Sequence, residues 1–178
     1  VGTGTLKILS EHGDLLERRC GRKLEVTAVS ARKMNKSRGV SLDGFDFFED
    51  AAEMAAEANC DVVVELIGGS EGIAKKTVES AIGASRHVVT ANKALIANHG
   101  TQLASKAEEA GITLAFEAAV AGGIPIIKAL REGLAANSMK SIYGILNGTC
   151  NYILSRMREE GLEFQEALED AQRLGCAE

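Results

Sequence analysis

Short apolar runs alternate with longer amphipathic segments along the chain as far as residue 116. The apolar runs are rich in β-branched residues and lie at 24–29, 61–67, 87–90 and 112–116. The amphipathic segments have helical spacing and lie at 3–12, 49–58, 70–84 and 94–110. The apolar runs predict strands. The run at 61–67 is nearly continuous, which is typical of a buried strand in a parallel sheet. Strands that alternate with helices through short connections predict a Rossmann-like, doubly wound α/β fold.

Local signals predict where several of these elements begin and end. Ser70 is the expected N-cap of the helix over 70–84, because its hydroxyl can accept a backbone N–H. Gly111 is expected just beyond the end of the helix over 94–110. Asn98-His99-Gly100 could interrupt that helix, and the polar, basic segment 31–41 predicts a loop.

The pattern changes after residue 117. Pro125, the only proline, follows two glycines and predicts the first turn of a helix over 126–135. Beyond it, the pattern predicts a strand and two helices, at 138–146, 150–160 and 164–174. We therefore expect a dinucleotide-binding domain over 1–117 and the beginning of a second, α+β domain over 118–178.

Composition narrows the class of protein. Of 178 residues, 46% are hydrophobic and 25% are charged, with a net charge of −5, which is typical of a globular chain. Nucleic-acid binding is not expected, because it needs clustered lysine and arginine. No apolar run approaches the roughly 18 residues of a membrane span. The four cysteines lack CxxC spacing and are expected to be reduced thiols of a cytoplasmic protein.

Ligands of an open parallel sheet bind beyond the carboxyl ends of its strands. Arg32 and Lys33 follow the first predicted strand, where an NAD-binding fold usually has an acid. Arginine can contact a 2′-phosphate there, which favours NADP over NAD; the alternative is a solvated basic loop. Gly2 belongs to a glycine-rich opening that leads into a helix, and it fits the last glycine of a phosphate-binding turn.

The next two strand ends carry further candidate cofactor contacts. Gly68 and Gly69 would let a phosphate or a flat ring approach the backbone, unless they only form a turn. Thr90, Ala91 and Lys93 follow the next predicted strand. The Lys93 ammonium could bind a carboxylate or polarise a carbonyl, whereas an isolated lysine is usually solvated.

Glu117 follows the strand predicted over 112–116 and precedes an irregular segment of small residues. A carboxylate beside exposed backbone carbonyls offers only oxygen ligands, which suits a hard cation. The alternative is a structural role in which Glu117 caps a helix.

Five segments together resemble the homoserine dehydrogenase family. They are Glu65-Leu-Ile-Gly-Gly69, Thr90-Ala-Asn-Lys-Ala-Leu95, Glu117-Ala-Ala-Val-Ala-Gly-Gly-Ile-Pro125, Gly144-Ile-Leu-Asn-Gly-Thr-Cys-Asn-Tyr152 and Gly175-Cys-Ala-Glu178. They follow the family's order and span nearly the whole chain, and Thr-Ala-Asn-Lys and Asn-Gly-Thr are the most specific. The resemblance implies an oxidoreductase that interconverts L-homoserine and L-aspartate 4-semialdehyde with NAD(P), in threonine, methionine and isoleucine biosynthesis.

The resemblance also implies roles for individual residues. Lys93 would be the catalytic and substrate-binding lysine beside the nicotinamide. Glu178 would contact the substrate amino group, and Gly148 and Gly175 would approach the cofactor.

A sodium ion is a further implication of the resemblance. Glu117 would hold it together with the backbone carbonyls of Val120, Gly122 and Ile124. Members of the family often dimerise through the second domain, so a homodimer is expected.

Parts of the family's pattern lie outside these residues. The first strand and first glycines of the phosphate-binding fingerprint would precede Val1, and the segment with an Asp and the proton-transferring Lys would follow Glu178. We therefore expect a chain truncated at both ends. Two alternatives stay open: a catalytically incomplete nucleotide-binding fragment, and another NAD(P) dehydrogenase of a small substrate.

Overall fold

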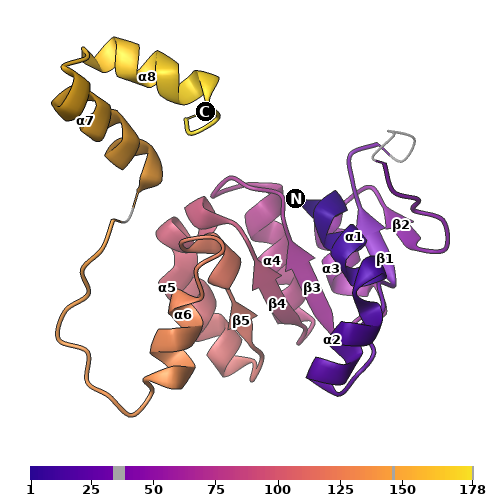
Figure 1. Ribbon diagram of the computed structural model, residues 1–178. Coiled ribbons are helices and arrows are strands. Elements are labelled where there is room, and N and C mark those ends of the chain that lie inside the picture. Colours follow the sequence, from indigo (N-terminus) through magenta and orange to yellow (C-terminus); the bar gives the residue numbers. More distant parts are fainter. Residues whose placement is uncertain (34–38, 146, 178) are drawn as a thin grey trace. The chain divides into compact units, whose positions relative to one another are not determined.

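The computed structural model describes residues 1–33, 39–145 and 147–177 (Figure 1). The chain forms two compact units, Val1–Gly133 and Leu134–Glu178. The domain boundary expected at 117 falls inside the first unit and stays a prediction. No helix of the described residues is long and apolar enough to cross a membrane.

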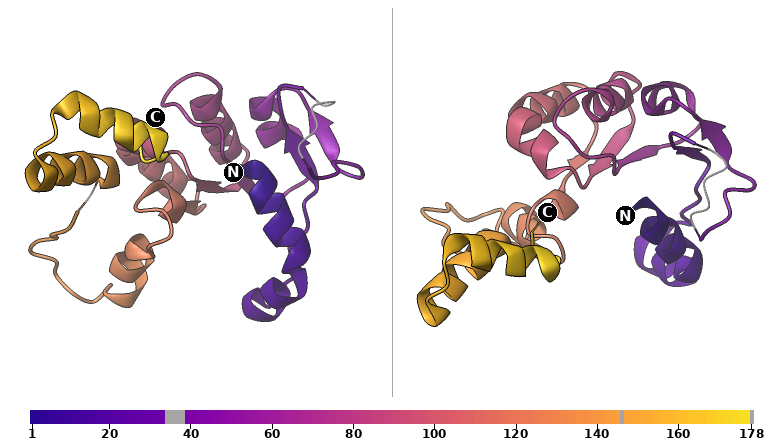
Figure 2. Two further views of the ribbon diagram at one scale, coloured as in Figure 1. Left: turned by 45° about the horizontal axis from the view of Figure 1, so that its top comes forward. Right: turned by 90° about the horizontal axis from the view of Figure 1, so that it is seen from above.

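The first unit alternates short parallel strands with helices. Its elements are α1 (Gly2–Glu11), α2 (Gly13–Cys20), β1 (Ala28–Ser30), β2 (Asp46–Phe48), α3 (Ala51–Glu57), β3 (Val62–Glu65), α4 (Ile73–Gly83), β4 (His87–Thr90), α5 (Lys93–Glu109), β5 (Leu114–Ala115), the 3-10 turn η1 (Glu117–Ala119), α6 (Ile126–Lys128) and the π-helical turn η2 (Ala129–Gly133). β1 pairs with β2, and β4 lies between β3 and β5, all in parallel. Helices α3 and α4 lie on one side of the strands and α1 on the other (Figure 2). The predicted parallel α/β fold is confirmed.

The core of the first unit lies between the β3–β5 sheet and the helices α3, α4 and α5. Its buried members are apolar: Ala55, Val63, Val78, Ala81, Ile82, Val88, Leu95, Leu103, Ala107 and Leu114. Along β3, Val63 is buried while Val62 and Val64 are exposed, because side chains of a strand alternate between its two faces. The apolar run at 61–67 was expected to be buried throughout, and this expectation is wrong for one face of β3.

Side chains cap both ends of α3 and thereby fix its place against the sheet. The Asp50 carboxylate accepts the backbone N–H groups of Ala52 and Glu53 at 2.7 and 3.0 Å. At the other end, Arg86 Nη1 donates to the carbonyls of Met54 and Ala55 at 3.2 and 2.8 Å. Two N–H groups at the start of this short helix and the Ala55 carbonyl near its end are therefore satisfied from outside the helix.

Several predicted boundaries move in the structure. The strand expected over 24–29 begins only at Ala28, because its partner β2 offers three residues to pair with. Ser70 is not an N-cap: α4 begins at Ile73 after Gly72, whose φ is +69°. The predicted helix over 126–135 becomes α6 followed by the π-helical η2, which ends at Gly133.

Helix α5 runs without the interruption that Asn98-His99-Gly100 suggested. The Asn98 side chain donates to the Ala94 carbonyl at 2.9 Å, which keeps it compatible with the helix. Gly111 has a φ of +67° directly after the helix end, so its predicted role there is confirmed.

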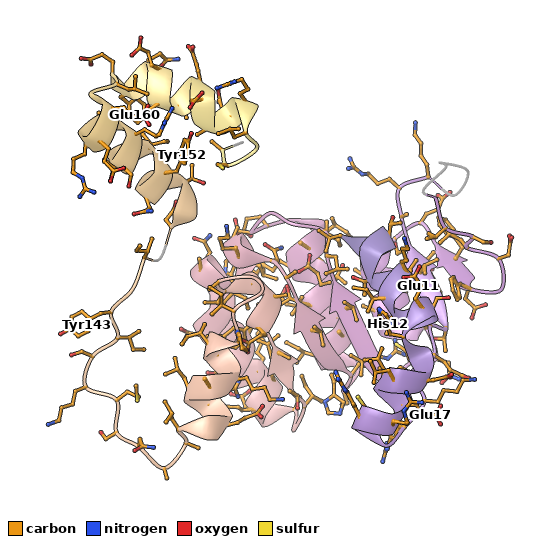
Figure 3. All side chains as sticks on the ribbon, in the orientation of Figure 1. Glu11, His12, Glu17, Tyr143, Tyr152 and Glu160 are labelled. Atoms are coloured by element: carbon orange, nitrogen blue, oxygen red, sulfur yellow. The ribbon has the colours of Figure 1, made fainter. Side chains whose placement is uncertain are left out.

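The second unit is a helical hairpin preceded by an extended segment. Its helices are α7 (Gly148–Glu160) and α8 (Phe164–Arg173), as predicted. The strand expected over 138–146 is wrong for 138–145, which pair with no strand of the described residues, and Leu146 lies outside them. A strand needs a hydrogen-bonded partner, and without one the Tyr143 side chain is 90% exposed (Figure 3).

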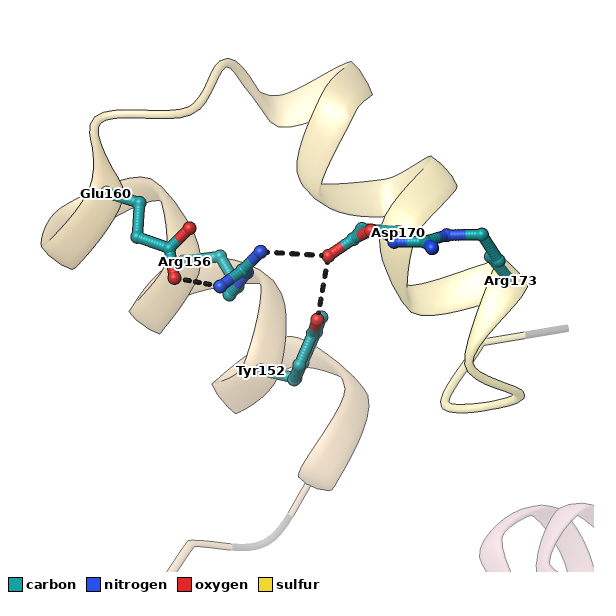
Figure 4. A network of polar contacts seen from close by, with 5 residues as sticks. All are labelled: Tyr152, Arg156, Glu160, Asp170 and Arg173. Atoms are coloured by element: carbon teal, nitrogen blue, oxygen red, sulfur yellow. Dashed lines mark hydrogen bonds and ion pairs between the residues drawn. The ribbon is translucent and has the colours of Figure 1, made fainter.

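Buried contacts between α7 and α8 are few, and polar contacts accompany them. Ile153, Ala167 and Ala171 form the buried centre of the hairpin. Beside it, Asp170 accepts from Tyr152 Oη and Arg156 Nη2, each at 3.0 Å, and from Arg173 (Figure 4). Arg173 and then Tyr152 hold the pKa of Asp170 below its usual range.

Candidate cofactor site at the carboxyl edge of the sheet

The residues that follow β3 and β4 lie side by side. Glu65 is in register with Thr90, and the Ala91 N–H donates to the Glu65 carbonyl at 3.2 Å. A Cβ placed on Gly2 would lie 4.0 Å from Leu66 Cδ1, so the start of α1 reaches the same edge. The structure therefore brings together the predicted contacts Gly2, Gly68, Gly69, Thr90, Ala91 and Lys93.

Gly68 and Gly69 form a turn that only glycine adopts without strain. Their φ angles are +88° and +82°. A Cβ on either residue would meet no atom of the described residues within 4 Å. The turn therefore needs glycine for its backbone, and it leaves open space through which a ligand can reach that backbone.

A buried polar network holds this turn against the start of α5. Glu65 is 1% exposed, and its Oε1 accepts the N–H groups of Ile67 and Gly68 at 2.7 and 3.2 Å. Its Oε2 accepts the Thr90 hydroxyl at 2.6 Å. The Asn92 amide donates to the Gly69 carbonyl at 2.7 Å and, more weakly, to Glu65 Oε1 at 3.4 Å. Because the Thr90 side chain is buried, its hydroxyl serves this network.

Lys93 is the first residue of α5, and its side chain is exposed. The preceding residue, Asn92, caps the helix by accepting the Leu95 N–H at 3.1 Å. Asn92 N–H itself donates to Thr90 Oγ1 at 3.0 Å. The backbone of Lys93 is thus fixed by its neighbours, while its ammonium is available at the sheet edge.

A second polar link joins the middle of α5 to the loop before α4. His99 Nε2 lies 2.5 Å from Glu71 Oε1, and Lys75 Nζ lies 3.8 Å from Glu71 Oε2. The contact with His99 is the main reason that the pKa of Glu71 is lowered. This link holds the loop that continues from Gly69.

Arg32 and Lys33 follow β1 after one intervening residue, Ala31, and both are exposed. Residues 34–38 of the predicted loop lie outside the described residues. The two cations are therefore at a strand's carboxyl end, as the sequence predicted.

Glu117 caps α6. Its Oε1 accepts the Ile127 N–H at 3.1 Å and its Oε2 accepts the Lys128 N–H at 2.7 Å. The Ile124 carbonyl accepts the Ile126 N–H at 2.8 Å. These are the contacts of the capping alternative. A carboxylate oxygen keeps further lone pairs, so capping is compatible with cation binding.

The second unit brings Gly148 and Gly175 close through the neighbours of each. The Thr149 hydroxyl donates to the Cys176 carbonyl, and Asn147 caps α7 by accepting the Cys150 N–H at 2.8 Å. Gly175 has a φ of +73°. Glu178, the predicted substrate contact, lies outside the described residues.

Sequence reasoning did not identify Glu65 as part of the site. The signal was an acidic residue at the end of an otherwise apolar strand, because such a residue must find buried donors. Asn92, which lies between Thr90 and Lys93, was also missed. The residues to which its amide donates, Glu65 and Gly69, are distant from it in the sequence.

Two family models match the chain. The model described as the NAD-binding domain of homoserine dehydrogenase matches residues 1–117, and the model described as homoserine dehydrogenase matches residues 125–178. The chain belongs to the homoserine dehydrogenase family. The nicotinamide-cofactor fold expected for its first part is that of the family's NAD-binding domain.

Curated relatives and solved structures agree with this assignment. Homoserine dehydrogenases of Neisseria gonorrhoeae and Pseudomonas aeruginosa are each 49% identical over 178 residues, which is 100% of this chain and 40% of theirs. The chain thus spans about 40% of the length of these relatives. A homoserine dehydrogenase structure from Thiobacillus denitrificans matches with a TM-score of 0.86 at 45% identity, over 100% of this chain and 41% of that one. The structure of a hyperthermophilic archaeal homoserine dehydrogenase in complex with NADPH matches with a TM-score of 0.81 at 27% identity. The match covers 99% of this chain and 58% of that one.

Proposed function

We propose that this chain forms the cofactor-binding part, and the opening of the catalytic part, of a homoserine dehydrogenase. The proposed reaction interconverts L-homoserine and L-aspartate 4-semialdehyde with NAD(P). The observation that carries the proposal is the open Gly68–Gly69 turn beside Lys93 at the carboxyl edge of a parallel sheet. Membership of the family and this edge agree on a nicotinamide cofactor.

The residues at this edge suit a bound dinucleotide. The nicotinamide cofactor would carry the hydride. The Gly68–Gly69 backbone would lie against it, because no atom of the described residues lies within 4 Å of a Cβ placed on either glycine. In the reductive direction the Lys93 ammonium would stabilise negative charge on the aldehyde oxygen of the substrate. Lys93 would orient that oxygen, and Glu178, Gly148 and Gly175 would complete the substrate and cofactor contacts.

Turnover by the full-length protein tests this proposal. NADPH oxidation should depend on L-aspartate 4-semialdehyde, and the reverse reaction should prefer L-homoserine to other amino alcohols. NADPH binding without turnover would instead support the nucleotide-binding fragment. Turnover with a different small substrate would support another dehydrogenase of this architecture.

We extend the proposal to a preference for NADP. Arg32 and Lys33 stand at the carboxyl end of β1, where a 2′-phosphate would meet them. The dissociation constants of NADP and NAD should differ in favour of NADP, and Arg32→Ala should reduce that difference. A preference for NAD that Arg32→Ala leaves unchanged would contradict it.

We also propose a sodium ion held by Glu117 and the carbonyls of Val120, Gly122 and Ile124. Cation binding would use the lone pairs that the capping N–H groups leave on the carboxylate. Replacing sodium by choline should lower the thermal unfolding midpoint. An unchanged midpoint would leave capping as the role of Glu117.

The proposed enzyme is a cytoplasmic homodimer whose ligands are small molecules, with no nucleic-acid or membrane partner. The mild negative charge and the described cysteines, which are unpaired thiols, support this setting. Light scattering of the full-length protein tests the dimer.

A further inference from the structure

Glu65 is a charged residue in a place where its strand otherwise buries apolar side chains. Along β3 and β4 the inward positions are Val63, Val88, Glu65 and Thr90, and the first two pack in the core. Burial of a carboxylate costs free energy unless hydrogen bonds replace its water. An apolar residue would serve the core at that position without this requirement.

The Glu65 carboxylate uses its two oxygens for two different segments. Oε1 accepts from the backbone of Ile67 and Gly68, which shapes the turn after β3. Oε2 accepts from Thr90, which in turn accepts from the Asn92 N–H at the start of α5. Charge-assisted hydrogen bonds of this kind are stronger than neutral ones. One side chain thus connects the glycine turn with the helix that begins at Lys93.

Asn92 closes the connection from the other side. Its amide donates to the Gly69 carbonyl at 2.7 Å while its oxygen caps α5. The position of Gly68–Gly69 relative to Lys93 is therefore set twice, once through Glu65 and Thr90 and once through Asn92.

We propose that Glu65 is a positioning residue for hydride transfer, acting through Thr90 and Asn92. This proposal rests on the proposed function of the site. Glu65 does not contact the substrate, because it is buried; it holds the cofactor-facing turn and the Lys93 backbone in a fixed relation. Displacement of reacting groups by about 1 Å can cost roughly a hundredfold in rate. Loss of the link should therefore lower kcat more than it changes the binding of either ligand.

The test uses Glu65→Gln and Thr90→Val in the full-length protein. Glu65→Gln removes the negative charge and replaces one acceptor oxygen with an amide donor. If the amide oxygen still accepts from the turn, the Thr90 hydroxyl loses the acceptor to which it donates. Thr90→Val keeps the side-chain shape and removes the hydroxyl link alone, which leaves the proposal testable if Glu65→Gln does not fold. Thr90→Ser retains the hydroxyl and should raise kcat well above that of Thr90→Val.

Thr77→Val is the matched control. Thr77 is a buried threonine of α4 whose hydroxyl donates to the Ile73 carbonyl at 2.7 Å, within its own helix. Thr77→Val also removes a buried threonine hydroxyl, but it leaves intact the link between the Gly68–Gly69 turn and the start of α5. Thermal unfolding midpoints and the NADPH dissociation constant are measured for every variant. The number of NADPH molecules bound per chain gives the fraction of folded sites, by which kcat is divided.

We expect Glu65→Gln and Thr90→Val to lower kcat per folded site about ten- to a hundredfold, with NADPH dissociation constants changed much less. Thr77→Val should retain kcat, and Thr90→Ser should give a kcat well above that of Thr90→Val. Equal kcat for Thr90→Val and Thr77→Val, or loss of NADPH binding in proportion to kcat, would overturn the positioning role. A wild-type protein that binds NADPH but lacks homoserine dehydrogenase turnover would instead reject the proposed function.

Discussion

The two units of the chain are held together by different kinds of interaction. The first has a continuous apolar core between a parallel sheet and the helices α3, α4 and α5. The hairpin of the second buries only a small centre at Ile153, Ala167 and Ala171 and adds an ion network around Asp170 (Figure 4). Apolar burial changes little with pH, whereas partly exposed ion pairs contribute less and depend on pH and salt. The units should therefore respond to different perturbations.

The polar networks of the two units also differ in how deeply they are buried. In the first unit, Glu65, Thr90 and Asn92 are buried and serve the candidate site. In the second, Tyr152, Arg156 and Asp170 are only partly buried and join the two helices of the hairpin. A buried polar network fixes geometry because each lost bond leaves an unsatisfied group, whereas water can replace a surface bond.

The largest effect is expected from Leu103→Ala in the core of the first unit. Leu103 is 0% exposed, so the substitution removes buried apolar area and leaves a cavity. The free energy of unfolding of the first unit should fall by about 2–5 kcal/mol. Urea unfolding followed by amide hydrogen exchange measures each unit separately. Leu154→Ala on α7, where the side chain is 63% exposed, should change stability by less than about 0.5 kcal/mol. Equal losses in the two variants would remove the contrast between the units.

Lys93→Ala separates chemistry from stability within the first unit. The proposed loss is of a cation beside the reacting oxygen, so kcat of the full-length protein should fall about a hundredfold or more. The NADPH dissociation constant and the unfolding midpoint should change little, because Lys93 is exposed. Steady-state kinetics at saturating substrate measures the effect. The exposed Lys76 on α4 provides the control, since Lys76→Ala should retain kcat. An unchanged kcat in Lys93→Ala would refute its catalytic role.

Gly68→Ala should strain the turn that the first unit places at its ligand edge. The φ of +88° is unfavourable for alanine, so the free energy of unfolding should fall by about 1–2 kcal/mol. Gly133→Ala at the end of η2 is the control: no atom of the described residues lies within 4 Å of its Cβ position and its φ is not positive, so stability should be retained or slightly raised. Thermal unfolding of both variants measures the difference, and equal midpoints would argue against strain at Gly68.

The smallest effect is expected in the hairpin of the second unit, as a dependence on pH. The pKa of Asp170 is lowered in the folded state, mainly by Arg173 and then by Tyr152. Its contribution to stability is therefore present above the unfolded-state pKa of about 3.9 and is lost as the pH falls through the folded-state value. The pKa of Tyr152 is raised, by burial first and then by Asp170, so its contribution is lost at alkaline pH.

Nuclear magnetic resonance of α7 and α8 during acid titration measures this dependence. Asp170→Asn should remove the loss of hairpin stability on the acid side. Glu159→Gln should retain it, because among the described residues Glu159 forms its ion pair with its neighbour Arg158 on α7 and makes none with α8. The core of the first unit should show no loss of stability over the same pH range. If the hairpin of Asp170→Asn still loses stability at low pH, the Asp170 carboxylate is not the cause.

Elements decided by their own residues were predicted well from the sequence. The run His87–Thr90 is β4 at the predicted positions, and the helices of the hairpin differ from prediction by two residues or fewer at each end. β-branched runs and helical spacing carry this information locally. Lys93, Gly68 and Gly69 could be placed at one edge as well, because parallel strands share the direction of their carboxyl ends.

Elements that depend on a distant partner were predicted less well. The strand over 24–29 shortened to three residues because β2, itself not predicted, is that long. The segment 138–145 has the alternation of a strand, but no strand of the described residues pairs with it. Helix α2, which begins at Gly13, was not predicted either.

The amino-acid sequence by itself determined the parallel α/β class, the family, and the candidate residues at the strand ends, because periodicity and short motifs are local properties. Only the tertiary structure decided which of those residues share a site and what holds them there. The hydrogen bond between Thr90 and Glu65 joins residues 25 positions apart, and that of Asn92 to Gly69 joins residues 23 positions apart. Such contacts form only when the strands pair and the interior excludes water, which is why the link from Glu65 to the start of α5 could not be predicted from the sequence.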